Sequence, residues 1–214
     1  SAFLLTRSSD LRFSLSLHKL RNKMSNDIPE SVSQRGHGAY DEENRRIQEI
    51  SDELQSLCQL HEAQSGAGQA DGGRFEIEQR VAEQYAKSVG LWIPMDIVFD
   101  LGAPGPSGNE NDTYVSSTTI YKVNNLLNAG GICKLLEKIL LHNQIFPNTS
   151  YKFYGFAGYD GRSVCPVLEQ ERVCNAKPAT QIMIDTYMSA LGFTKESEEG
   201  RYSNGTYLVW DVVP

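Results

Sequence analysis

The stretch from Ile120 to Glu137, IYKVNNLLNAGGICKLLE, decides how this chain is expected to fold. It continues a β-branched run, residues 118–121, that predicts a strand ending near Lys122. Residues 132–141 have the apolar spacing of a helix that carries one acid, Glu137. A strand lysine would therefore face a glutamate on the next helix, and such a pair can hold the lysine ammonium against a phosphate. The alternative is an ordinary surface pair of two solvated charges, which contributes little.

Composition limits the classes of protein to which the chain can belong. Its 214 residues can hold one sizeable domain and an extension. A net charge of −7 argues against nucleic acid or an anionic membrane surface as the main partner. Four cysteines without a Cys-x-x-Cys pair indicate reduced, structural thiols in a cytoplasmic protein. No apolar run is long enough to span a membrane, and a start at Ser1 without a signal-peptide pattern suggests that the chain begins partway through a longer protein.

The first third of the chain predicts a lead-in, a helix and a linker. Residues 1–40 show no sustained period, which indicates a disordered segment or linker. An amphipathic helix is expected over 41–64, and its short stripe favours docking on the domain over a coiled coil. Residues 65–73, SGAGQADGG, predict a flexible linker and a domain boundary, with the domain itself over 74–214. The stripe consists of Ile47, Ile50, Leu54 and Leu57.

A glycine-rich loop, residues 102–111, is expected between a strand at 95–99 and another at 113–115. Its glycines, Gly102, Gly105 and Gly108, would let the backbone approach a phosphate closely, and exposed amides there could cradle the phosphate. An ordinary hairpin loop explains the same residues equally well. The loop lacks the Gly-Lys-Ser/Thr ending of a Walker loop.

The remaining pattern predicts an α+β fold. Hairpin strands at 151–156 and 164–170 follow the helix of Glu137, which gives five strands with one helix after the third. A helix over 178–191 and a final hairpin over 202–210, turned at Asn204-Gly205, complete the chain.

Four segments together resemble the kinase-like domain of the polyvalent proteins found in bacterial mobile elements. The resemblance covers about residues 74–214. It implies a protein-kinase-like N-lobe over about 92–172, a five-stranded antiparallel sheet with one αC-type helix, followed by the start of a helical C-lobe over 173–214. The segments are IYKVNN at 120–125, HNQIFPNT at 142–149, LEQ at 168–170 and WDVVP at 210–214.

The resemblance also implies site residues. Lys122 would contact the phosphates of ATP, with Glu137 as its ion-pair partner. Asp211 would orient the acceptor hydroxyl, because Asp-Val-Val-Pro resembles the Asp-Leu-Lys-Pro of a kinase catalytic loop, although Val209-Trp210 replaces the preceding His-Arg. The glycine-rich loop would supply further nucleotide contacts through Gly102, Gly105, Gly108 and Asn109. The hinge, into which the last strand of the N-lobe runs, would supply contacts at Glu169 and Glu171.

The residues that bind Mg²⁺ in kinases would lie beyond Pro214, so we expect this fragment to bind ATP and to be catalytically incomplete, with Mg²⁺ used by the complete parent domain. The first hypothesis is the nucleotide-binding part of a phosphotransferase that is active in its parent on an unidentified protein or hydroxyl acceptor. The second is a non-catalytic, pseudokinase-like interaction module of a mobile-element polyprotein, which binds a partner through the 41–64 helix.

Overall fold

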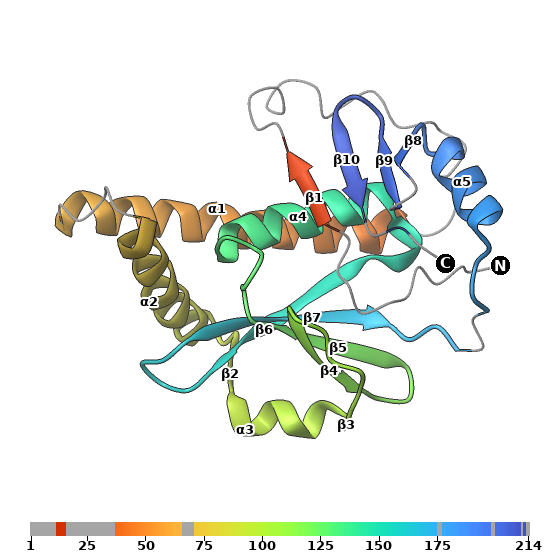
Figure 1. The fold of residues 1–214 in the computed structure, drawn as a ribbon. Coiled ribbons are helices and arrows are strands. Elements are labelled where there is room, and N and C mark those ends of the chain that lie inside the picture. The colour runs from red at the N-terminus through yellow and green to blue at the C-terminus, as the bar shows by residue number, and fades with distance from the viewer. Residues whose placement is uncertain are drawn as a thin grey trace. The chain divides into compact units, whose positions relative to one another are not determined.

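The computed structural model describes residues 12–15, 37–65, 71–174, 177–197, 200–210 and 212 (Figure 1). The chain divides into two compact units, and each is described by itself below. One unit comprises residues 38–172, and the other combines residues 1–37 with 173–214. Asp211, the expected catalytic aspartate, lies outside the described residues, as do residues 66–70 of the expected linker.

Two long helices begin the first unit. Helix α1 spans His37–Ser65, and helix α2 spans Asp71–Val89, so helical structure starts inside the stretch read as a linker. Three residues of the α1 stripe are buried, with Ile47 and Leu54 fully inaccessible to solvent, and Leu57 is partly buried. Helix α1 is therefore part of the core of this unit.

A six-stranded sheet forms the centre of the unit, in the order β2-β6-β7-β5-β4-β3. Five neighbouring strands pair antiparallel, and β2 adds a parallel edge strand beside β6, which corrects the expected five-stranded antiparallel sheet. Glycines permit this extra strand, because a Cβ on Gly155 would lie 2.7 Å from the Leu91 carbonyl oxygen and one on Gly158 2.8 Å from the Trp92 ring. The strands are β2 Trp92–Pro94, β3 Ala103–Pro104, β4 Asn111–Val115, β5 Thr119–Asn124, β6 Tyr151–Gly158 and β7 Val164–Glu171.

The strand predicted over residues 95–99 is wrong. Helix α3, Met95–Val98, and the 3₁₀ turn η3, Phe99–Leu101, occupy this stretch. Pro94 ends the preceding strand with φ −53°. Met95, Val98 and Leu101 then follow at helical steps of three and pack on one face of the sheet, with Val98 fully buried.

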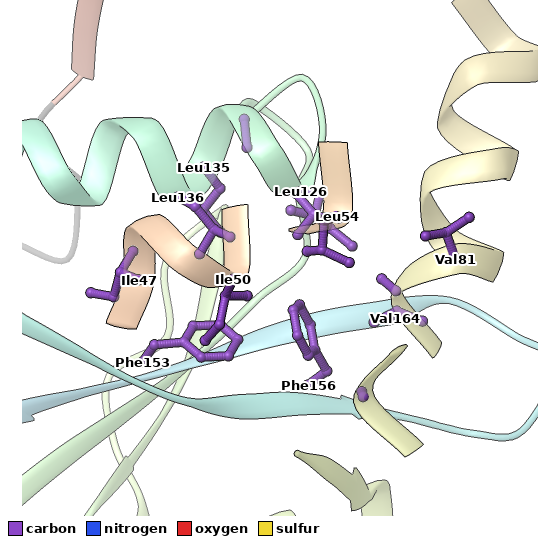
Figure 2. Packing of buried hydrophobic residues seen from close by; sticks show 14 of the residues in the cluster. Ile47, Ile50, Leu54, Val81, Leu126, Leu135, Leu136, Phe153, Phe156 and Val164 are labelled. Atoms are coloured by element: carbon purple, nitrogen blue, oxygen red, sulfur yellow. The ribbon is translucent and has the colours of Figure 1, made fainter. Parts of the chain in front are cut away.

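The opposite face of the sheet carries the main core. Helix α4, Ile132–Ile145, lies between β5 and β6 in the chain, as the sequence pattern predicts, and is followed by the 3₁₀ turn η4, Pro147–Thr149. Figure 2 shows Ile50 and Leu54 of α1 between Leu136 of α4 and the strand residues Phe153 and Phe156. Apolar residues of α2, including Val81 and Ala82, complete this cluster.

Helix α1 also covers part of the outer edge of β6. The register of β6 against β7 shifts between Phe153 and Gly155, and β2 pairs with β6 only from Phe156 onward. The Glu43 carboxylate accepts a hydrogen bond from the Phe153 amide at 2.8 Å, and the Arg46 guanidinium donates to the Phe153 carbonyl at 3.2 Å. Side chains of α1 thus satisfy backbone groups that a neighbouring strand would otherwise bind.

The second unit contains helix α5, Gln181–Ala190, and an antiparallel sheet in the order β1-β10-β9-β8. The helix and the hairpin turned at Asn204-Gly205 agree with the sequence pattern. Strands β1 and β8 were not expected, and the described part of this unit is richer in strands than the helical C-lobe that the resemblance implies. The strands are β1 Arg12–Leu15, β8 Thr194–Ser197, β9 Arg201–Ser203 and β10 Tyr207–Trp210.

Candidate functional site

Lys122 lies on β5 and points to the helix-covered face of the sheet. It stands opposite Leu168 of β7, whose side chain belongs to the main core. The Lys122 ammonium donates a hydrogen bond to the Tyr151 hydroxyl at 2.9 Å and lies 4.8 Å from the centre of the same ring. The side chain is partly buried, so this ammonium is better shielded from water than a surface lysine.

Glu137 lies on α4 and is also partly buried. Its Oε1 atom accepts a hydrogen bond from the Gln55 amide of α1 at 3.2 Å. Among the ion pairs between described residues, none joins Glu137 to Lys122. Lys122 and Glu137 therefore lie on the same side of the sheet without an ion pair between them, and each bonds to a different neighbour.

The N-terminus of α4 is capped by a carboxylate from α2. Glu78 accepts hydrogen bonds from the amides of Ile132 at 2.8 Å and Cys133 at 2.9 Å. Gly131 makes room for this carboxylate, since a Cβ at that position, with φ +127°, would lie 2.5 Å from a Glu78 oxygen. The negative charge of Glu78 also interacts favourably with the positive end of the helix dipole. Glu78 therefore stabilises the start of the helix that carries Glu137.

The C-terminus of α4 is tied to the start of β6. Asn143 accepts a hydrogen bond from the Tyr151 amide at 2.7 Å and donates to the Tyr151 carbonyl at 2.8 Å. It also donates to the Asn44 side chain of α1 at 2.9 Å. The Tyr151 hydroxyl is therefore hydrogen-bonded to Lys122, and the Tyr151 backbone is hydrogen-bonded to Asn143.

His142 is buried beside this tyrosine, with ring centres 4.8 Å apart. Its Nε2 atom lies 3.0 Å from the Thr149 carbonyl, which requires an Nε2–H donor. Burial lowers the pKa of His142 to about 4, and the positive charge of Lys122 acts in the same direction. The ring is therefore neutral at pH 7, and it packs within the segment at 142–149.

The glycine-rich loop lies against β4. The Gly105 amide donates to the Thr113 carbonyl at 2.8 Å, and the Gly108 amide donates to the Asn111 carbonyl at 3.0 Å. Gly102 approaches so closely that a Cβ there would lie 2.6 Å from Val115 backbone atoms. The amides of Gly105 and Gly108 are therefore not the exposed donors that the sequence suggested. The next residue, Asn109, accepts a hydrogen bond at its carbonyl from the Asn125 side chain at 2.8 Å.

The two glutamates that were expected at a hinge, Glu169 and Glu171, differ from Lys122 in orientation. Because Tyr121 stands opposite Glu169, the strand alternation places Glu169 and Glu171 on the sheet face away from Lys122. Glu169 lies 3.5 Å from the exposed ammonium of Lys152. Any contact of this segment with a ligand at Lys122 would have to use its backbone.

Sequence reasoning missed two partners in this arrangement, Gln55 and Tyr151. Gln55 lies one residue after Leu54 of the apolar stripe and therefore sits at its border, which is the signal that could have placed it near α4. Tyr151 is brought to Lys122 by the pairing of both β5 and β6 with β7. Pairing between strands that are distant in sequence cannot be read from periodicity.

Two cysteines of the main core, Cys58 and Cys133, behave as structural thiols, and neither forms a disulfide. Burial, followed by the charge of Glu78, raises the pKa of Cys58 to about 11, and the same two causes raise the pKa of Cys133. These thiols are protonated at neutral pH and are poor nucleophiles.

Other features of the described residues do not enlarge the site. A surface hollow of about 500 Å³ is lined by Lys87, Trp92, Met95 and Tyr159, among others, and includes none of the expected site residues. Among the described residues there is no group of three His, Cys, Asp or Glu side chains that could hold a metal ion. A search of the same residues finds no helix with the length and hydropathy of a membrane span.

Comparison with known proteins adds a family. Residues 76–211 match the family described as "Serine/Threonine/Tyrosine Kinase found in polyvalent proteins". Calcium up-regulated protein E from Dictyostelium discoideum is 32% identical over 95 residues, which cover 42% of this chain and 12% of that protein. The chain thus spans a small part of the length of this relative. No solved structure gives a significant match.

Proposed function

Because the chain belongs to the family of serine/threonine/tyrosine kinases found in polyvalent proteins, we propose that residues 38–172 form the nucleotide-facing part of a kinase-like phosphotransferase domain. The proposal rests on the position of Lys122. It is a partly buried ammonium on a central strand, it faces the helix of Glu137, and it lies inside the segment that matches the family. Such an ammonium can neutralise the α- and β-phosphates of ATP.

The remaining roles follow from this position. Glu137 would orient the ammonium of Lys122, and backbone groups of the Glu169–Glu171 segment would bind the adenine edge. Asp211 would orient the acceptor hydroxyl of an unidentified protein or other substrate. Mg²⁺, when bound, supplies the charge neutralisation that phosphoryl transfer requires, and we propose the transfer itself for the parent protein.

The residues fit ATP in part. Lys122 offers a suitable charge, and Gly102 and Gly105, where a Cβ would clash with Val115 or Thr113 of β4, leave the loop without side chains at these two positions. The amides of Gly105 and Gly108 fit less well because they donate within the loop. Phosphate binding by these two amides would require the loop to leave β4, whereas binding by Lys122 requires only a rotation of one side chain.

Thermal unfolding in the presence of nucleotide tests the proposal. With 1 mM ATP, a dissociation constant of about 0.1 mM would raise Tm by about 3 °C. Measurements with and without Mg²⁺ separate a metal-dependent from a metal-independent mode of binding. Lys122→Ala should abolish the shift, and Lys152→Ala, which removes an exposed lysine from the same sheet, should preserve it. An equal shift in both variants would remove Lys122 from this role.

A non-catalytic interaction module is the second candidate. The internal bonds of Lys122, Glu137, Gly105 and Gly108 favour it, because each group already has a partner within the chain. The apolar stripe of α1 is part of the core, so a partner protein would have to bind another face of that helix. Absence of any ATP-dependent shift in the wild-type chain would favour this candidate.

A further inference from the structure

The surface hollow beside α2 shares no residue with the candidate nucleotide site and has a lining of its own. It is formed where the last turn of α2 and strand β2 meet the first turn of α3 and the turn between β6 and β7. A volume of about 500 Å³ gives room for a long side chain of another molecule. The aromatic and apolar part of the lining consists of Trp92, Pro94, Met95 and Tyr159.

The walls of this hollow are held in place by contacts within the chain. A Cβ on Gly158 would lie 2.8 Å from the Trp92 ring, so glycine lets that ring lie close to β6. Trp92 also packs against the main core, which fixes the ring. The turn that carries Tyr159 is tied to α2, because the Gly161 amide donates to the two Glu83 carboxylate oxygens at 3.1 and 3.2 Å. The hollow is therefore formed before any partner binds.

Both aromatic rings of the lining lie beside cations of the chain itself. The Lys87 ammonium is 5.0 Å from the centre of the Trp92 ring. The Arg162 guanidinium carbon is 5.8 Å from the centre of the Tyr159 ring. Both distances are within the range in which the negative face of an aromatic ring attracts a cation. The rings of this hollow are thus placed where they favour positive charge.

Two carboxylates in the lining differ in their partners. Asp160 accepts from the Lys87 ammonium at 2.8 Å, and the same ammonium donates to Glu83 at 2.7 Å. Asp96, in the first turn of α3, is exposed and makes no ion pair with any residue that the structure describes. The three acids outnumber the two bases, Lys87 and Arg162, by one negative charge. The net charge of −7 for the whole chain also favours a basic partner.

From this lining we propose that the hollow binds an arginine side chain presented by a partner protein. The apolar stem of that arginine lies on Met95, and its guanidinium group lies beside the Tyr159 ring and donates to the Asp96 carboxylate. A guanidinium group suits this lining better than an ammonium group, because its planar face stacks on aromatic rings while its edge donates two hydrogen bonds to a carboxylate. The inference does not depend on the proposed nucleotide site, since the two share no residue.

Two peptides that differ only in charge provide the first test. One is a tripeptide with blocked ends and arginine between two glycines, and the other has citrulline, the uncharged isostere, in place of arginine. The chain has two tryptophans, so fluorescence in a Trp210→Phe background reports on Trp92 alone. The arginine peptide should bind saturably and about 5-fold more tightly than the citrulline peptide. Calorimetry on the wild-type chain repeats the comparison without the substitution, and equal binding of the two peptides, or no binding of either, would overturn the proposal.

Substitutions with opposite effects on charge provide the second test. Asp96→Asn removes the carboxylate that receives the guanidinium group and should weaken binding of the arginine peptide by about 3- to 5-fold. Lys87→Met removes a like charge and releases Asp160, so it should tighten binding by a similar factor. Asp100→Asn is the matched control, because Asp100 is exposed and does not line the hollow, and it should leave the affinity unchanged. Equal weakening by Asp96→Asn and Asp100→Asn would show that the peptide responds only to net charge and would reject the site.

Discussion

The two faces of the six-stranded sheet differ in how they are covered. One face carries α1, α2 and α4, and its cluster has 18 buried residues, which come from these three helices, two strands and the loop before α4. The other carries the short α3 and η3, and its cluster has five buried residues. Lys122 and Glu137 lie on the first face. The candidate site is therefore built on the part of the unit that is most firmly packed, which suits a site that needs fixed charges.

The largest difference between the faces should appear when buried side chains are shortened. Leu54→Ala leaves a cavity between α1, α4 and the sheet and should cost about 2–5 kcal/mol of unfolding free energy. Val98→Ala, on the opposite face, should cost less because fewer carbon atoms are removed from a smaller cluster. Leu60→Ala, on the exposed side of α1, is the control and should change stability little. Denaturant unfolding of the three variants measures these values, and equal losses for Leu54→Ala and Leu60→Ala would place α1 outside the core.

Lowering the pH should reduce the free energy of unfolding, because His142 is buried as a neutral ring on the helix-covered face. Its pKa is about 4 in the folded protein, and an unfolded histidine has a pKa near 6.5. The unfolded chain therefore binds a proton first, so the stability that comes from the neutral ring is present above pH 6.5 and is lost as the pH falls toward 4. The slope reaches about 1.4 kcal/mol per pH unit within that window.

The variant His142→Gln separates this effect from the titration of carboxylates. The glutamine amide nitrogen can take the position of histidine Nε2, so it keeps a donor near the Thr149 carbonyl, and it cannot gain a proton in this range. Between pH 7 and pH 4.5, Tm should fall less for the variant than for the wild type. Parallel pH profiles for the two proteins would contradict the assignment of the low pKa to His142.

Loss of the Glu78 cap should have a smaller effect, restricted to the start of α4. Glu78→Ala removes the acceptor for two helix amides and should cost about 1–2 kcal/mol, with faster amide hydrogen exchange at Ile132 and Cys133. Glu76→Ala, an exposed glutamate on the same helix, is the matched control. Exchange rates at these two amides that did not respond to Glu78→Ala would show that the cap is dispensable.

The smallest effect is expected at the hairpin turn between β6 and β7. Lys87 bonds to Glu83 at 2.7 Å and to Asp160 at 2.8 Å on the surface. Asp160→Ala should lower the stability less than Glu78→Ala does, since exposed ion pairs contribute little. Thermal unfolding at low and high salt measures the difference, which should be largest at low salt. A loss as large as that of Glu78→Ala would mean that this surface pair is more important than its exposure suggests.

Local chemistry made part of the fold predictable. The spacing of Leu135, Leu136 and Ile139 indicated α4, and Asn204-Gly205 indicated the last hairpin, because these patterns act over a few residues. Met95–Phe99 was misread because a short apolar run fits a strand and a helical turn alike. The parallel strand β2 was missed because nothing within Trp92–Pro94 indicates which distant strand it will join.

The candidate site was predictable to the level of its elements. Lys122 and Glu137 were placed on a strand and the following helix, and the structure puts them on those elements. Their partners, Gln55 and Tyr151, come from elements 82 and 29 residues away in the sequence. Such contacts are set by the packing of α1 and by strand order, and neither is encoded in the local pattern around Lys122.

The bonds from α1 to the Phe153 backbone bear on how this protein should be produced. The segment that matches the family starts at residue 76, so an expression limited to the matched segment would begin there. Such a shortened chain would expose the apolar side of α4 and leave the irregular border of β6 open to strands from other molecules. Low solubility of that shorter chain would then reflect the missing helix and would say nothing about the kinase-like fold itself.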